Sequence, residues 1–298
     1  MSTIVKIDRL TKSYKDIDAV KDVSFTLEEN KIYGMLGRNG AGKTTIMHLL
    51  TAQSFPTSGE IEVFGENPYE NDRVLRRICF VKESQKYPNT FKVRDVLDVA
   101  GALFPNWDRS FALSLVEDFR LPLKRKVVKL SRGMLSAVGI IVGLASRAPL
   151  TIFDEPYLGL DAVARSLFYD RLLEDYAEHP RTIVLSTHLI DEVSRMLEHV
   201  ILIDRGRLLL DEESEHLQGR AYTVVGSSDK IEAFGAGKRV LSREAMGGLT
   251  TITILSDSAL EDRKQAQSLG LELAQVTLQQ LIVHLTGNKN DRKEANVQ

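Results

Sequence analysis

The residues best suited to chemistry form a glycine-rich loop, Gly37-Arg38-Asn39-Gly40-Ala41-Gly42-Lys43-Thr44, which matches the phosphate-binding pattern G-x-x-x-x-G-K-[ST]. Glycines let successive backbone N–H groups point at one anion, and the amino terminus of the following helix adds its dipole. Lys43 is placed to reach the β and γ phosphates, and the Thr44 hydroxyl to ligate Mg²⁺. We therefore expect a nucleotide to contact Gly37, Asn39, Gly40, Ala41, Gly42, Lys43, Thr44 and Thr45.

The same loop argues against a dinucleotide cofactor. A G-x-G-x-x-G fingerprint that begins with Gly40-Ala41-Gly42 would need a glycine at position 45, where the chain has Thr45. The loop therefore favours a nucleoside triphosphate over NAD.

A second group of reactive side chains follows the apolar run Leu150-Thr151-Ile152-Phe153, which is predicted to be a buried strand. Asp154 at its end is a candidate Mg²⁺ ligand, and Glu155 is a candidate base that orients and deprotonates an attacking water. Alone, such a pair is more often part of a solvated loop. Together with the phosphate loop upstream, it predicts nucleotide hydrolysis.

Alternating strands and helices are expected to position these groups. Strands are predicted at 4–7, 23–27, 31–36, 59–65, 150–153, 182–186 and 200–203, and helices at 43–50, 163–176 and 190–197. From about Val93 to Ala145 the periodicity is helical, with breaks at Pro105 and Pro122. The pattern predicts an α/β fold with a doubly wound, largely parallel sheet and an inserted helical subdomain.

A second, smaller domain is predicted after an acidic, irregular stretch at 212–219. We expect the first domain to cover 1–212 and the second to cover 213–287. The second reads as strand, helix, strand, strand, helix, strand (222–225, 229–234, 238–241, 249–255, 260–269 and 271–276), with a last helix at 278–285. This is the βαββαβ order of a ferredoxin-like α+β domain. The polar tail 288–298 is expected to be disordered.

The composition excludes several classes of protein. With 39 Lys and Arg against 41 Asp and Glu over 298 residues, the net charge of −2 does not favour a polyanionic partner. The single cysteine, Cys79, cannot form an internal disulfide or a cysteine-rich zinc site, and an inert buried thiol in a reducing cytoplasm fits best. No apolar stretch reaches the roughly 20 residues of a spanning helix, so we expect that the chain itself does not cross a membrane.

Four further motifs make the chain resemble the ATP-binding subunits of ABC transporters. These subunits are P-loop NTPases, so the resemblance implies that fold. Leu130-Ser131-Arg132-Gly133-Met134 stands at the position of the family's LSGGQ signature. Gly159-Leu160-Asp161 looks like the D-loop, Ser186-Thr187-His188 like the switch histidine, and Tyr14 like the aromatic residue that stacks on adenine. Each motif is weak alone, but their order and spacing are specific, and the resemblance covers about residues 3–212.

The resemblance implies roles for these residues. Ser131 and Gly133 would contact the γ phosphate of ATP held by the other subunit of a head-to-tail dimer, and Asp161 would connect the two sites. His188 would sense the γ phosphate, so that Glu155, His188 and Lys43 form the catalytic set. ATP would be hydrolysed only when two such domains, identical or different, close on each other.

The sequence departs from the family pattern at several positions. Glu83 stands where the family has the Q-loop glutamine; it can still ligate Mg²⁺ beside Thr44 and Asp154, and Gln85 is an alternative candidate. In the signature, Arg132 replaces a glycine and Met134 the glutamine; Arg132 either adds positive charge near the phosphates or faces solvent. Tyr157 stands where many relatives have threonine.

The leading functional hypothesis is the ATPase subunit of an ABC transporter that powers a separately encoded permease from the cytoplasmic face of the membrane, with ATP and Mg²⁺. The C-terminal domain and the segment 277–287 resemble ATPases of bacterial ABC-2-type exporters, and Glu83 with the stretch 154–162 resembles the group that exports antimicrobial or cytolytic peptides, drugs and lipids. One alternative is a soluble ABC ATPase acting on nucleic acid or ribosomes, although the long coiled coils or paired domains of such proteins are missing. A regulatory ATPase that has lost transport is another.

Overall fold

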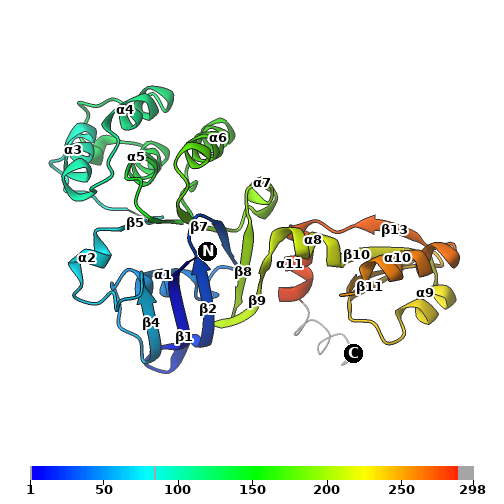
Figure 1. The fold of residues 1–298 in the computed structure, drawn as a ribbon. Helices are drawn as coiled ribbons and strands as arrows, with labels where there is room; N and C mark the ends of the chain where they lie inside the picture. The colour runs from blue at the N-terminus through cyan, green and yellow to red at the C-terminus, as the bar shows by residue number, and fades with distance from the viewer. Residues whose placement is uncertain (1, 84, 288–298) are drawn as a thin grey trace. The chain divides into compact units, whose positions relative to one another are not determined.

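The computed structural model describes residues 2–83 and 85–287, so the predicted disordered tail lies outside the described residues. The chain divides into two compact units (Figure 1). The first comprises residues up to His188 together with Ile201–Leu210, and the second comprises Leu189–Val200 and the residues from Asp211 onward. Each unit is described by itself.

A six-stranded sheet forms the centre of the first unit, in the order β5-β6-β7-β3-β8-β9. The neighbouring pairs β5–β6, β6–β7 and β7–β3 are parallel. Every residue of β3, β6 and β7 is buried, as expected for parallel strands covered on both faces. The strands are β3 (Ile32–Leu36), β5 (Ile78–Val81), β6 (Leu150–Asp154), β7 (Thr182–Thr187), β8 (His199–Asp204) and β9 (Arg207–Glu213).

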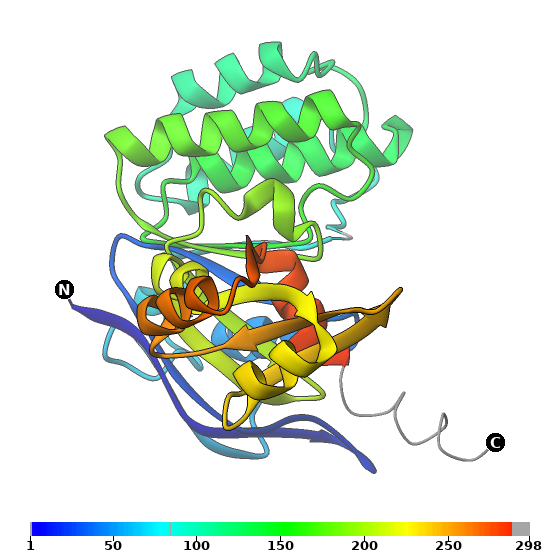
Figure 2. The ribbon, with the colours of Figure 1, turned by 90° about the vertical axis from the view of Figure 1, so that its right-hand side faces the viewer.

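Helices cover both faces of this sheet. Figures 1 and 2 show α1 on one side and α3 to α6 on the other. The predicted helical stretch 93–145 contains α3, α4, a short 3-10 turn and α5, so the α/β class with an inserted helical part is confirmed. The helices are α1 (Lys43–Leu50), α2 (Asp72–Leu75), α3 (Val93–Leu103), α4 (Arg109–Asp118), η1 (Val127–Lys129), α5 (Arg132–Ala145) and α6 (Ala162–Glu178).

A second sheet in this unit is antiparallel, with the order β2-β1-β4. Strands were expected at 4–7 and 23–27, but both are parts of a long hairpin formed by β1 (Thr3–Tyr14) and β2 (Ile17–Glu28). Strand β4 (Ser58–Val63) completes the sheet. The outer parts of the hairpin are polar and half-exposed, so they lack the apolar alternation that marked its buried core.

The second unit contains a four-stranded antiparallel sheet in the order β11-β12-β10-β13. Its elements follow the predicted βαββαβ order, and this strand order is that of a ferredoxin-like fold. A last helix packs on α7, which belongs to the same unit. The elements are α7 (Ile190–Val193), α8 (Ser214–Arg220), β10 (Ala221–Ser227), α9 (Ser228–Gly235), β11 (Val240–Met246), β12 (Leu249–Leu255), α10 (Ala259–Ser268), β13 (Glu272–Gln275) and α11 (Leu278–Gly287).

Three local expectations were wrong or incomplete. The stretch 212–219 is not irregular, since β9 runs to Glu213 and α8 follows, anchored by the buried Ser214 and Leu217 among charged neighbours. The helix expected at 190–197 ends at Val193. Strand β5 was not predicted, although its residue Cys79 is buried as expected, and burial raises the pKa of that thiol to about 12. Within the described residues, no helix is both long and apolar enough to cross a bilayer.

Candidate nucleotide-binding site

The phosphate loop connects β3 to α1 through glycines that no other residue could replace without strain. Gly37 and Gly42 have φ angles of 146° and 111°. A Cβ on Gly37 would lie 2.1 Å from the carbonyl oxygen of Ile203, and one on Gly42 would lie 2.5 Å from that of Ala19. Because Gly42 caps α1 without a side-chain hydrogen bond, the first turn of the helix keeps amide groups available for an anion.

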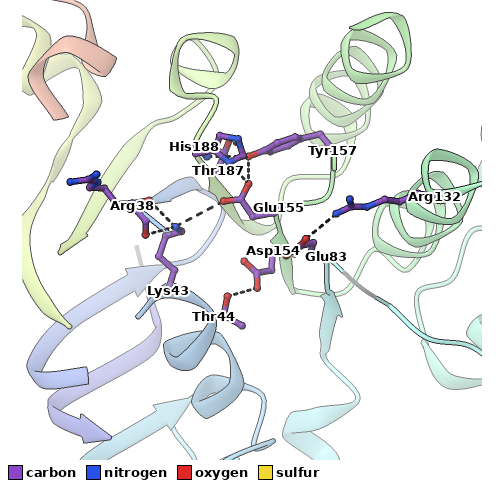
Figure 3. Close-up of polar contacts among 11 residues, drawn as sticks. Arg38, Lys43, Thr44, Glu83, Arg132, Asp154, Glu155, Tyr157, Thr187 and His188 are labelled. Carbon is purple, nitrogen blue, oxygen red and sulfur yellow. Dashed lines mark hydrogen bonds and ion pairs between the residues drawn. The ribbon is translucent and has the colours of Figure 1, made fainter. Parts of the chain in front are cut away.

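This loop forms one wall of a pocket of about 490 Å³, a volume typical of a small-molecule site. The pocket brings together the candidate residues from the loop, from the end of β6 and from the residue after β7 (Figure 3). It is lined by Ala19, Asn39, Gly40, Ala41, Gly42, Lys43, Thr44, Thr45, Glu83, Asp154, Glu155, Leu158 and His188. Ala19 and Leu158 were not predicted, since neither carries a recognisable chemical signal.

Lys43 is buried in the pocket wall and is held by the loop itself. Its Nζ donates to the carbonyl oxygen of Gly37 at 2.7 Å and to that of Arg38 at 3.3 Å. The same atom lies 4.0 Å from Oε1 of Glu155. Burial lowers the pKa of Lys43, although the nearby carboxylates of Glu155 and Asp154 act in the opposite direction. A phosphate beside this ammonium group would therefore favour its charged form.

Asp154 is placed to share a cation with Thr44. The Thr44 hydroxyl donates to Oδ2 of Asp154 at 2.7 Å. The other oxygen, Oδ1, is buried and has no hydrogen-bond partner among the described residues. A buried carboxylate oxygen without a partner is costly unless a cation or ligand satisfies it. Oxygen ligands of this kind suit Mg²⁺, which keeps several waters and takes further ligands from phosphates, so these residues fit the ion.

Glu155 has an unusual backbone conformation, and only one of its two carboxylate oxygens has hydrogen-bond partners in the described chain. Its φ angle of 49° lies in the left-handed region, which is rare for a residue other than glycine. Oε2 contacts Nδ1 of His188 at 2.8 Å and accepts a hydrogen bond from the hydroxyl of Tyr157 (Figure 3). Oε1 is buried without a hydrogen-bond partner within the described part of the chain. One oxygen is thus fixed and the other faces the pocket.

Glu83 and Arg132, two of the departures from the family pattern, form an ion pair. The Arg132 guanidinium lies 3.1 Å from Oε1 of Glu83, and both side chains are largely exposed, at 66% and 45% (Figure 3). Glu83 lines the nucleotide pocket, whereas the alternative candidate Gln85 lines neighbouring pockets instead. Of its two expected roles, Arg132 takes the solvent-facing one within the single chain, because its side chain is 66% exposed and pairs with Glu83 outside the lining of the nucleotide pocket.

Five candidate residues are not brought to this pocket by the described chain: Tyr14, Gly37, Ser131, Gly133 and Asp161. Gly37 contributes its carbonyl oxygen to Lys43 and leaves no room for a side chain beside Ile203. Tyr14 is 47% exposed at the end of β1. Ser131 caps α5 by accepting from the Met134 N–H at 3.2 Å, and Asp161 caps α6 by accepting from the Ala164 N–H at 2.8 Å.

Comparisons with known proteins agree with this geometry. The family described as "ABC transporter" matches residues 20–158. The bacitracin transport ATP-binding protein BcrA of Bacillus licheniformis is 35% identical over 239 residues, which cover 78% of each chain. The Nod factor export ATP-binding protein I of Sinorhizobium fredii (strain NBRC 101917 / NGR234) is 31% identical over 304 residues, covering 96% of this chain and 86% of that protein.

Solved structures share the fold. An ATP-binding subunit of an ABC transporter matches with a TM-score of 0.65 at 23% identity, covering 78% of this chain and 94% of that one. A dimeric ATP-binding cassette in a post-hydrolysis state, bound to ADP and phosphate, matches with a TM-score of 0.61 at 24% identity, covering 71% and 99%. These likenesses confirm the expected P-loop fold.

The fold and the pocket thus define a nucleoside triphosphatase of the P-loop class. The chain belongs to the family of ABC transporter ATP-binding proteins. It is an ATP-binding and ATP-hydrolysing subunit of a transporter, a membrane-associated system. A solved ABC cassette that shares its fold is dimeric. The alternative of a soluble ATPase acting on nucleic acid or ribosomes is not supported by these relatives.

Proposed function

We propose that this chain is the ATPase of an exporter, and that it powers a separately encoded permease from the cytoplasmic face of the membrane. The observation that carries the proposal is a single pocket that joins the phosphate loop, the Thr44–Asp154 pair and Glu155. The export direction is supported by relatives named for bacitracin transport and Nod factor export. The transported molecule is expected to be chosen by the permease.

The pocket residues support a division of labour in hydrolysis. The loop amides and Lys43 bind the β and γ phosphates, and Thr44 with Asp154 holds Mg²⁺. When bound, the ion neutralises charge on the phosphate oxygens. Oε1 of Glu155 orients a water and accepts its proton, as the water oxygen attacks the γ phosphorus and the bond to the β–γ bridging oxygen breaks. His188 contacts the γ phosphate.

Glu83 is a further candidate Mg²⁺ ligand, but one of its oxygens is already paired with Arg132. Its Oε1 is engaged by Arg132, so this oxygen can become a Mg²⁺ ligand only by exchanging that partner. An exposed ion pair contributes little stability, about 0–1 kcal/mol. The exchange is therefore inexpensive, and it would release Arg132 when the nucleotide binds.

The residues outside the pocket support a dimer. Ser131 and Asp161 lie exposed at the amino ends of α5 and α6, where a facing subunit can reach them. We propose that Ser131 and Gly133 contact the ATP of the facing subunit, that Asp161 links the two sites, and that Tyr14 stacks on adenine. The facing subunit is a second copy or a related cassette.

An apolar pocket of about 420 Å³ is a suitable docking place for the permease. It lies between the segment after β5 and helix α3, and includes Gln85, Tyr87 and Phe104. Val99 and Leu103, also in its lining, are 43% and 60% exposed. Exposed apolar surface of this kind commonly marks a protein interface, and its position after β5 would connect it to Glu83.

The same proposal includes a division of the chain into two domains. We propose that 1–212 form the ABC domain and 213–287 a C-terminal domain with its own core; the second compact unit supports this boundary in that it contains the residues from Asp211 onward, although it also includes Leu189–Val200. A separate apolar cluster that includes Tyr222, Ile231, Phe234 and Ile254 fills the ferredoxin-like sheet and its helices.

Affinity purification of the tagged chain from detergent-solubilised membranes tests the proposal. We expect an integral membrane protein to be recovered in constant proportion and the preparation to hydrolyse ATP with Mg²⁺. The matched control, Lys43→Ala, should recover the same membrane protein without ATP binding. Recovery of ribosomes or nucleic acid in place of a membrane protein would contradict the transporter assignment.

A further inference from the structure

The hydroxyl of Tyr157 lies at the centre of a buried hydrogen-bond cluster. It donates to Oε2 of Glu155, and it lies 3.0 Å from Oγ1 of Thr187, from the backbone N of His188 and from Nδ1 of the same histidine (Figure 3). Tyr157 itself is only 3% exposed. A single phenol oxygen thus contacts both the proposed base and the switch histidine.

The protons of this cluster can be assigned. The phenol has one proton, which it donates in a hydrogen bond to Oε2 of Glu155. Its oxygen then accepts from the Thr187 hydroxyl and from the His188 backbone N–H. Burial, followed by the hydrogen bond to Glu155, raises the pKa of Tyr157. The phenol therefore stays protonated at neutral pH and remains a donor.

The cluster fixes which oxygen of Glu155 faces the nucleotide. Oε2 contacts both the phenol and Nδ1 of His188, while Oε1 lies 4.0 Å from Nζ of Lys43 and lacks a hydrogen-bond partner among the described residues. Rotating the carboxylate would break the contacts of Oε2. The hydroxyl, together with the His188 ring, thus holds the Glu155 carboxylate in place, with one oxygen in the cluster and the other facing the pocket.

The topology explains why a long side chain is needed at this position. Tyr157 follows Glu155 by two residues after β6, whereas Thr187 and His188 lie at the end of the neighbouring parallel strand β7. A threonine at this position would carry its hydroxyl next to its own backbone. The phenol spans the gap between the two strand ends.

We propose that Tyr157 is a positioning residue for ATP hydrolysis, whose hydroxyl holds the Glu155 carboxylate and the His188 ring in one cluster so that Oε1 faces the bound nucleotide. The proposal rests on the proposed function, in which Glu155 is the base. Tyr157 itself does not touch ATP. Its removal should therefore change the rate of hydrolysis and leave nucleotide binding intact.

The test compares Tyr157→Phe with the wild type, because phenylalanine keeps the buried ring and removes only the hydroxyl. We expect kcat to fall about tenfold or more, in the range of a lost positioning contact, and KM for ATP to stay within about twofold. Tyr169→Phe is the control, since Tyr169 is another buried tyrosine of the same unit outside the pocket lining. It should keep the wild-type kcat.

Thr187→Val is the second variant for the case in which Tyr157→Phe folds poorly, and where Tyr157→Phe folds the two substitutions form a double-mutant cycle. Thr187→Val removes one contact of the phenol and leaves Tyr157 and Glu155 in place. We expect a smaller fall in kcat at constant KM, and no further loss when Thr187→Val is added to Tyr157→Phe, since coupled residues are not additive. Independent, additive effects would overturn the proposal, as would a fall in kcat that comes with an equal loss of ATP affinity.

The outcome for Glu155→Gln separates this inference from the proposed function. If that variant loses turnover while Tyr157→Phe keeps the wild-type kcat, only the role of Tyr157 is wrong. If Glu155→Gln itself keeps turnover, the assignment of the base is wrong and the inference falls with it.

Discussion

At the scale of residues, the adjacent carboxylates of Asp154 and Glu155 have different hydrogen-bond partners. Asp154 gives one oxygen to the Thr44 hydroxyl and leaves the other without a hydrogen-bond partner in the described chain. Glu155 directs one oxygen to Tyr157 and His188 and the other toward Lys43. The first arrangement suits a cation ligand, and the second suits an oriented base.

Glu155→Gln should bind ATP and hydrolyse it at least about 100-fold more slowly, because an amide cannot accept the proton of the attacking water. In the presence of ATP and Mg²⁺ the variant should therefore accumulate as a dimer. Size-exclusion chromatography with light scattering and a phosphate-release assay provide the two measurements. An undiminished rate would remove Glu155 as the base.

At the scale of elements, the signature segment and the loop before α6 are in very close contact. A Cβ placed on Gly133 would lie 2.4 Å from the carbonyl oxygen of Gly159. The residue Gly159 has a φ angle of 90°. This contact joins the start of α5 to the loop that carries Asp161. Within the single chain, Gly133 is therefore required for packing as well as for its proposed contact with the facing nucleotide.

Gly133→Ala should lower stability by about 1–3 kcal/mol, the usual cost of overpacking, because the backbone of the loop cannot move aside as a flexible side chain would. Urea unfolding with a constant m-value measures the change. Gly219→Ala is the matched control: it lies in α8 with no heavy atom within 4 Å of the added Cβ. The control should be neutral or slightly stabilising, and equal effects in both variants would refute the packing argument.

At the scale of the whole molecule, the two units have separate cores, and each buries its own charged side chains. The second unit contains a buried carboxylate, Asp262, that accepts from Tyr222 at 2.7 Å and pairs with Lys238. Burial alone would raise the pKa of Asp262, but the hydrogen bonds from Lys238, Ser256 and Tyr222 outweigh it, and the pKa is lowered. The ionised form is thus the one that the folded unit stabilises.

The second unit should therefore lose stability in acid. A carboxyl group whose folded pKa is lowered stabilises the fold above its unfolded value, near 4, and this contribution is lost as the pH falls through the lower folded value. Hydrogen exchange of the β10 and β12 amides between pH 6 and 3 follows the change. In Asp262→Asn the dependence should be flatter, and an unchanged pH dependence in that variant would contradict the role of Asp262.

Much of the molecule followed from local sequence. The phosphate loop, the buried strand before Asp154 and the βαββαβ order of the second unit were predictable, because glycine spacing, apolar runs and alternation act over a few neighbouring residues. The strand β5 and the helix α8 were missed. In α8, two buried residues, Ser214 and Leu217, lie among charged ones, so the local pattern is weak.

Only the tertiary structure decided which distant side chains meet. Arg132 pairs with Glu83, 49 residues earlier, and Tyr157 reaches Thr187 and His188, about 30 residues later. These contacts depend on β7 lying beside β6 in the sheet and on where α5 begins, and no short pattern encodes such an arrangement. The sequence by itself determined the chemistry of phosphate binding, whereas the strand order determined how the base is held.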